Sequence, residues 1–159
     1  MREFRRPYWK IVVQYFDTSA LVKQYLQEAG SKIVLELLKT GDKVYTASLT
    51  YAETHAAFSR RTREGRLPRE TSRRLALRFD KDWESYDIVM LSETVLRLAR
   101  QLLYRHPLRS ADAIHLASAL LLARTSPSHP WAFVCADSRF CEVAEAHGFE
   151  PVFTAGDPA

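Results

Sequence analysis

The chain has 159 residues, of which 47% are hydrophobic, enough to build one domain with a buried core and an argument against a second domain. Its formal net charge of +4 at pH 7 favours an anionic partner but excludes no fold. The apolar run at 11–16 is too short for a signal peptide or a membrane span, so we expect a cytoplasmic protein that does not associate with a membrane.

Short runs rich in Val, Ile, Tyr and Phe alternate with segments of helical periodicity along the chain. The runs predicted as strands are 11–16, 43–47, 86–91, 131–136 and, more briefly, 151–153. Helices are predicted to begin at or near Ser31, Ser48, Pro68, Ser92 and Ser110. This alternation predicts an α/β fold, in which helices cover both faces of a mainly parallel sheet.

The rest of the chain indicates a single functional unit. We expect a basic extension at 1–10, one domain at 11–153 and a loose tail at 154–159. The glycines follow helical segments or lie in the tail, so no GxGxxG, GxxxxGK[ST] or GxSxG motif is present. This argues against dinucleotide oxidoreductases, P-loop NTPases and serine hydrolases. Cys135 and Cys141 lack metal-ligand spacing, and we predict two buried thiols.

Four acidic residues are predicted to meet at one edge of the sheet. Asp17 ends the first strand, and Asp137 ends the fourth. Glu53 lies in the first turn of the helix after the second strand, and Asp112 in the first turn of the helix that begins around Ser110. Because ligands of open parallel sheets bind beyond the carboxyl ends of the strands, these four side chains are expected to share a cleft.

Each acid alone has a simpler explanation as a helix cap or as a first-turn residue that answers the helix dipole. Together they pose an electrostatic problem, because two like charges ~4 Å apart repel by about 1 kcal/mol in water and about 4 kcal/mol at an effective dielectric near 20. A divalent cation relieves this repulsion, and all-oxygen ligands favour Mg²⁺ or Mn²⁺. Such an ion with a bound water suits phosphodiester hydrolysis.

Eight arginines crowd two adjacent predicted helices: Arg60, Arg61, Arg63, Arg66, Arg69, Arg73, Arg74 and Arg78. A basic face of this kind could follow a phosphate backbone. It could equally be a solvated helix surface or a docking face for an acidic protein segment.

The segments YFDTSALVKQYL, TASLTYAETHAAF, LRSADAIHLASAL and VCADSRF resemble, in order and spacing, the acidic motifs of the PIN domain. The resemblance is greatest to the VapC-like toxins of prokaryotic toxin–antitoxin pairs, and it spans roughly residues 12–152. It implies a three-layer α/β/α sandwich and a Mg²⁺- or Mn²⁺-dependent endoribonuclease. The residues that match the metal-binding acids of the family are Asp17, Glu53, Asp112 and Asp137.

The same resemblance extends to neighbouring residues and to partners. Thr18 and Ser19 match the polar pair after the first acid, whereas Ser138 stands where some relatives carry a further acid, which leaves the number of metal ions open. The resemblance also implies an RNA substrate, an antitoxin whose segment covers the cleft, and a homodimer.

Two further side chains have alternative interpretations. His115 lies three residues after Asp112 on nearly the same helical face, so it could orient that acid, touch substrate or be an ordinary buried histidine. Arg109 could hold a phosphate at the rim of the cleft or be an ordinary surface arginine.

Two other functions are alternatives to RNA hydrolysis. A non-catalytic PIN-like module would keep the acidic cleft and bind RNA or protein without cleavage. A phosphotransfer domain fits less well, because the third strand ends in Met90-Leu91 without the acceptor acid of a receiver, and DTSAL lacks the second acid of a DxDxT phosphatase loop.

Overall fold

The computed structural model describes residues 13–41, 43–127 and 129–155. The strands are β1 (Val13–Phe16), β2 (Val44–Ala47), β3 (Asp87–Val89), β4 (Trp131–Cys135) and β5 (Glu150–Phe153). The helices are α1 (Thr18–Leu21), the 3₁₀ helix η2 (Val22–Gln24), α2 (Ser31–Thr40), α3 (Leu49–Arg63), α4 (Arg69–Trp83), α5 (Glu93–Arg105), α6 (Ser110–Ala123) and α7 (Ser138–Ala146). The predicted extension at 1–10 lies outside the described residues, as do residues 156–159 of the predicted tail.

The predicted elements are confirmed, with boundaries that shift by a few residues at most. All five strands form where the β-branched and aromatic runs indicated them. Ser92 caps α5 as expected, because its hydroxyl accepts a hydrogen bond from the backbone N–H of Val95 at 3.3 Å. Pro68 directly precedes α4, and α6 begins at Ser110. Within the part of the chain that is described, no helix is long and apolar enough to cross a membrane.

The strands form one parallel sheet in the order β3-β2-β1-β4-β5. The chain builds outward from β1 through β2 to β3, and then returns to the other side of β1 to add β4 and β5. Val13 therefore lies opposite Trp131, and Phe16 opposite Val134. The order reverses between β1 and β4, and this switch point is where open α/β sheets hold their ligands.

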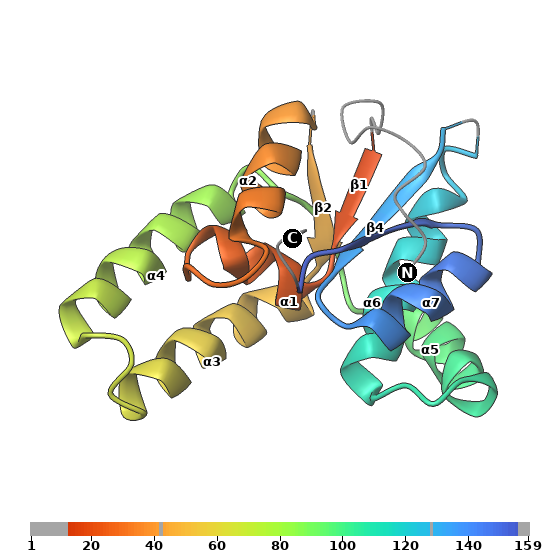
Figure 1. Cartoon of the computed structure of the whole chain (residues 1–159). Helices are drawn as coiled ribbons and strands as arrows, with labels where there is room; N and C mark the ends of the chain where they lie inside the picture. Colours follow the sequence, from red (N-terminus) through yellow and green to blue (C-terminus); the bar gives the residue numbers. More distant parts are fainter. Residues whose placement is uncertain (1–12, 42, 128, 156–159) are drawn as a thin grey trace.

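The sheet separates two cores, because successive side chains along each strand point to opposite faces. Tyr15 and Phe133 pack into a core shared with α5, α6 and α7. Phe16 and Val134 pack into a second core with α1 and α2. The predicted three-layer α/β/α sandwich is thereby confirmed, and Figure 1 shows the sheet between its helices.

Helices α3 and α4 extend away from the sheet side by side, joined by the turn at residues 64–68 (Figure 1). We call these two helices and their turn the arm. Phe58 and Phe79 are buried between them, beside Tyr25 of the segment after η2. Gly65 adopts a φ of 71° in the turn, a backbone conformation that glycine takes without steric cost. The arm therefore packs around a small apolar cluster that it shares with the segment at residues 22–26.

Candidate active site

The four acids predicted to converge all lie at the carboxyl edge of the sheet. Asp17 directly follows β1, and Asp137 lies two residues after the end of the neighbouring strand β4. Glu53 and Asp112 lie near the N-termini of α3 and α6. Burial raises the pKa of the Asp17 carboxyl, and the negative charges of Glu53 and Asp112 raise it further. These two acids therefore act electrostatically on Asp17 although they come from separate elements.

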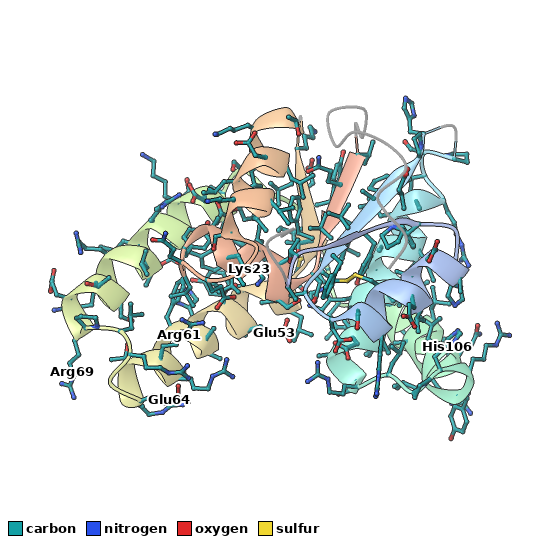
Figure 2. All side chains as sticks on the ribbon, in the orientation of Figure 1. Lys23, Glu53, Arg61, Glu64, Arg69 and His106 are labelled. Atoms are coloured by element: carbon teal, nitrogen blue, oxygen red, sulfur yellow. A yellow bond between two sulfur atoms is a disulfide. The ribbon has the colours of Figure 1, made fainter. Side chains whose placement is uncertain are left out.

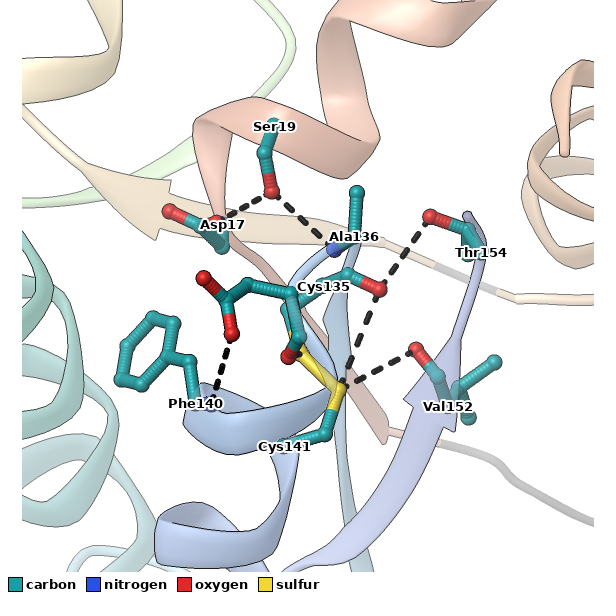
Figure 3. Close-up of a disulfide and its surroundings, with 9 residues drawn as sticks. Asp17, Ser19, Cys135, Ala136, Phe140, Cys141, Val152 and Thr154 are labelled. Carbon is teal, nitrogen blue, oxygen red and sulfur yellow. Dashed lines mark hydrogen bonds between the residues drawn. A yellow bond between two sulfur atoms is a disulfide. The ribbon is translucent and has the colours of Figure 1, made fainter. Parts of the chain in front are cut away.

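Asp17 is almost fully buried, with 6% of its surface exposed. Its side chain does not cap α1, so the simpler explanation fails for this residue. Instead its Oδ2 accepts a hydrogen bond from the hydroxyl of Ser19 at 2.5 Å, and Ser19 Oγ accepts one from the backbone N–H of Ala136 at 3.1 Å (Figure 3). Ser19 thus ties the carboxylate after β1 to the backbone after β4.

Glu53 does not form the capping box that its spacing from Thr50 allowed. Its Oε2 accepts hydrogen bonds from the Thr18 hydroxyl and from His115 Nε2, the latter at 2.9 Å. Burial alone would raise the pKa of this carboxyl, but the hydrogen bond and positive charge of His115, the hydroxyl of Thr18 and the charge of Arg109 outweigh burial and lower it. Glu53 is therefore held as a carboxylate that faces the site.

Asp112 forms a close ion pair with Arg109 and is the less exposed of the two residues. Arg109 Nε donates to Asp112 Oδ2 at 3.1 Å, and the two side chains are 79% and 15% exposed respectively. This hydrogen bond is the main cause that raises the pKa of Arg109, and the charges of Asp137 and Asp17 act in the same direction. Arg109 accordingly stands at the rim of the acidic edge, within electrostatic range of all four acids.

Asp137 is exposed and does cap a helix. Its Oδ1 accepts a hydrogen bond from the backbone N–H of Phe140 at 3.1 Å, so the capping interpretation holds for this acid. Ser138 is exposed at the first position of α7. The fourth acid therefore serves the fold whatever else it does.

The four carboxylates do not close around a common point. Within the described residues, no three His, Cys, Asp or Glu side chains are arranged so that they could hold a metal ion. Asp112 is engaged by Arg109 and Asp137 by the N-terminus of α7. Asp17 and Glu53 both face His115. The donor atoms are nevertheless the oxygens that Mg²⁺ and Mn²⁺ prefer, and their mutual repulsion is of the kind that a cation relieves.

His115 is 1% exposed, which leaves it no surface for substrate. Its Nε2 lies 2.9 Å from Glu53 Oε2, 3.1 Å from Thr18 Oγ1 and 3.4 Å from Asp17 Oδ1. Its Nδ1 lies 3.0 Å from the hydroxyl of Tyr15. The helical spacing pointed to Asp112 as its neighbour, but the hydrogen-bond partners of the ring lie on β1, α1 and α3.

Sequence reasoning missed Tyr15, the fully buried partner of His115. A signal was present, because Tyr15 precedes Asp17 by two positions and side chains two apart on a strand share a face. The face of β1 that carries Tyr15 leads into the acidic edge. Tyr15 also belongs to the core that the sheet shares with α5, α6 and α7.

The expectation of two buried thiols is wrong in one respect. Cys135 and Cys141 are buried, but their sulfur atoms are joined in a disulfide (Figure 3). The bond links the end of β4 to the first turns of α7, on either side of Asp137. The segment that carries the fourth acid is therefore closed by a covalent link as well as by the cap.

Comparison with known proteins identifies the family to which this chain belongs. Residues 15–146 match the family model of the PIN domain. Two curated proteins from strains of Mycobacterium tuberculosis, ribonuclease VapC45 and ribonuclease VapC49, are each 39% identical to the chain over 110 residues, covering 67% of this chain and 74% of each relative.

Two solved structures share the fold. One is a toxin–antitoxin complex from Klebsiella pneumoniae, with a TM-score of 0.62 at 16% identity over 91% of this chain and 99% of that chain. The other is VapBC2 from Rickettsia felis bound to a DNA fragment from its promoter, with a TM-score of 0.57 at 13% identity over 89% and 97%. The family match and the curated relatives agree with the site geometry, and the chain belongs to the PIN domain family, where it is VapC-like.

Proposed function

We propose that this chain is a VapC-like endoribonuclease that hydrolyses RNA phosphodiester bonds at the acidic edge of its sheet. The observation that carries the proposal is the burial of Asp17 at the switch point between β1 and β4, within electrostatic range of Glu53 and Asp112. The curated relatives, both named ribonucleases, support the same reaction. We assign the activity to the domain at 11–153.

Asp17, Glu53, Asp112 and Asp137 would hold Mg²⁺ or Mn²⁺. When bound, the ion would supply an activated water and stabilise negative charge on the phosphate oxygens. The chain itself orients the acids: Ser19 holds Asp17, and Thr18 and His115 hold Glu53. Asp112 and Asp137 would exchange their present partners, Arg109 and the N-terminus of α7, for the cation.

The far end of the arm supplies a complementary surface for RNA. Figure 2 shows Arg69 at that end, well away from Glu53 at the base of α3. The exposed arginines of the arm between residues 60 and 74 are Arg60, Arg63, Arg66, Arg69, Arg73 and Arg74. Within the described part of the chain, only Arg66 of this set is in an ion pair, with Glu64. We propose that these side chains bind phosphates of the RNA on one side of the cleaved bond, while Arg109 contacts a phosphate at the rim.

The test compares the wild-type chain with Asp17→Asn. Brief induction of each, followed by sequencing of RNA ends, should yield new ends only for the wild type. Cleavage of RNA by the purified protein should require Mg²⁺ or Mn²⁺ and fall by about a thousandfold in the variant, equivalent to about 4 kcal/mol of transition-state stabilisation. A folded Asp17→Asn protein with undiminished cleavage would refute the assignment.

The partners follow from the same proposal. An antitoxin that covers the acidic edge is supported by the structural likeness to toxin–antitoxin complexes. A homodimer is supported by exposed apolar side chains on α5 and after β3: Met90, Leu91, Leu96, Leu103 and Tyr104. We place the pair in the cytoplasm. Co-purification with the product of a neighbouring small reading frame tests the antitoxin, and light scattering at micromolar concentration tests the dimer.

A second candidate function is a non-catalytic module that binds RNA or protein. The observation that favours it is the ion pair of Asp112 with Arg109 together with the capping role of Asp137, which leaves two of the four acids already engaged. Binding of RNA without any cleavage at saturating Mn²⁺ would support this function over hydrolysis.

A further inference from the structure

Resting on the proposed function, we infer that Tyr15 and His115 form a positioning pair that fixes the Glu53 carboxylate for cation binding. Neither residue touches solvent: Tyr15 is 0% exposed and His115 is 1% exposed. Tyr15 comes from β1, His115 from α6 and Glu53 from α3. The pair therefore joins three elements whose relative placement decides where the Glu53 oxygens lie.

The hydrogen on His115 Nε2 follows from its surroundings. This nitrogen lies 2.9 Å from Glu53 Oε2 and 3.4 Å from Asp17 Oδ1, and ionised carboxylates only accept hydrogen bonds. Nε2 must therefore carry a hydrogen whether the ring is neutral or charged. In the neutral ring Nδ1 is then the acceptor, and the Tyr15 hydroxyl at 3.0 Å is its donor. The Tyr15 contact thus selects the tautomer that can bind Glu53.

The same contacts give the two carboxylate oxygens of Glu53 different roles. Within the described residues, both side-chain hydrogen bonds to this carboxylate, from Thr18 and from His115, end on Oε2. Its side chain remains 30% exposed toward the edge. With Oε2 held by the body of the domain, Oε1 is the oxygen offered to a cation. A metal-binding carboxylate fixed in this way has a lower cost of ordering when the ion arrives.

Three substitutions separate this role from ordinary packing. In His115→Gln, the side-chain amide N–H can replace Nε2–H toward Glu53. In His115→Asn, the shorter side chain reaches the position of Nδ1 near Tyr15 but not Glu53. Tyr15→Phe keeps the ring in the core and removes only the hydroxyl. Thr54→Val is the matched control, because Thr54 is buried on the same helix as Glu53 and its hydroxyl has no partner among the described residues.

The measurements are Mn²⁺ affinity by titration calorimetry, and kcat and KM for an RNA oligonucleotide, with folding checked by circular dichroism. His115→Asn should lower Mn²⁺ affinity and kcat by about ten- to a hundredfold and leave KM for RNA unchanged. His115→Gln should recover most of this loss. Tyr15→Phe should lower both quantities by less than His115→Asn, and Thr54→Val should match the wild type.

Equal losses in His115→Gln and His115→Asn would overturn the inference, as would a folded Tyr15→Phe protein with wild-type Mn²⁺ affinity. The failure of the proposed function gives a different result. Wild-type protein that binds Mn²⁺ without cleaving RNA refutes the ribonuclease, while the affinities of the variants still decide the positioning role. Wild-type protein without Mn²⁺ affinity refutes both.

Discussion

The acidic edge carries negative charges, one of them buried, whereas the arm carries positive charges that are exposed to solvent. The carboxylate of Asp17 is buried and held by Ser19, and Glu53 is fixed by Thr18 and His115. The arginines at the end of the arm are exposed, on a helical hairpin that packs on the body through one small apolar cluster. Charges in water are screened within about 8 Å at physiological salt, whereas partly buried charges interact more strongly. The edge therefore holds its carboxylates at fixed positions, whereas the exposed arginines of the arm suit the salt-dependent RNA binding proposed above.

The largest expected effect tests whether the arm is held by the apolar cluster at its base. Phe79 is fully buried against Tyr25 and Phe58, so Phe79→Ala should lower the free energy of unfolding by about 3–5 kcal/mol. Leu77 on the same helix is 71% exposed, and Leu77→Ala is the control, expected to change it by less than about 0.5 kcal/mol. Urea denaturation measures both. Similar values for the two variants would show that α4 does not hold the arm by packing.

Charge reversal separates binding at the arm from chemistry at the edge. Replacing Arg63, Arg69 and Arg73 by Glu should raise KM for RNA, leave kcat nearly unchanged and lower the slope of log affinity against log salt by about 2 to 3. The control reverses the same number of charges on α5, at Arg97, Arg100 and Arg105. If the α5 variant loses as much affinity as the arm variant, the attraction comes from net charge rather than from the arm.

The buried charge at the edge should destabilise the protein when no cation is present. Burial and neighbouring acids raise the pKa of Asp17 in the folded protein. The protonated side chain therefore contributes fully to the free energy of unfolding below its unfolded-state pKa of about 3.9. This contribution is lost as the pH rises through the folded-state pKa. At pH 7 without metal, Asp17→Asn should therefore be more stable than the wild type by about 1 kcal/mol. Added Mn²⁺ should raise the melting temperature of the wild type only.

Thermal unfolding from pH 3.5 to pH 8 in a chelator decides this prediction. The difference in stability between Asp17→Asn and the wild type should grow with pH. A difference that stays constant or shrinks would show that Asp17 is relieved by its protein neighbours alone.

The smallest effect distinguishes the two roles of Asp137. Asp137→Ala removes the cap on α7 and should cost about 1 kcal/mol of stability, whereas Asp137→Asn keeps an oxygen for the N–H of Phe140 and should cost much less. Both variants remove the charge, so both should lose RNA cleavage. Retained cleavage in Asp137→Asn would assign this residue to the cap alone.

The sequence predicts where the backbone elements lie better than it predicts which side chains contact one another. The ends of β1 and β4, and hence the positions of Asp17 and Asp137, follow from apolar runs and from the rules of parallel sheets. The partner of His115 does not follow, because helical spacing relates it to Asp112 on its own helix, whereas packing turns the ring toward β1 and α3. The disulfide was missed for the same reason, since it depends on how α7 packs beside β4.

The pairing of β1 with β4 also has a consequence for the timing of activity. Asp17 is synthesised early and Asp137 late, and the strands that carry them are adjacent only across the switch point. A nascent chain that has left the ribosome only as far as α6 lacks β4, so Ser19 has no Ala136 to bind and the first acid has no neighbour across the sheet. On the proposed assignment of the metal-binding acids, unfinished translation products would therefore not cleave RNA until the last strands are made.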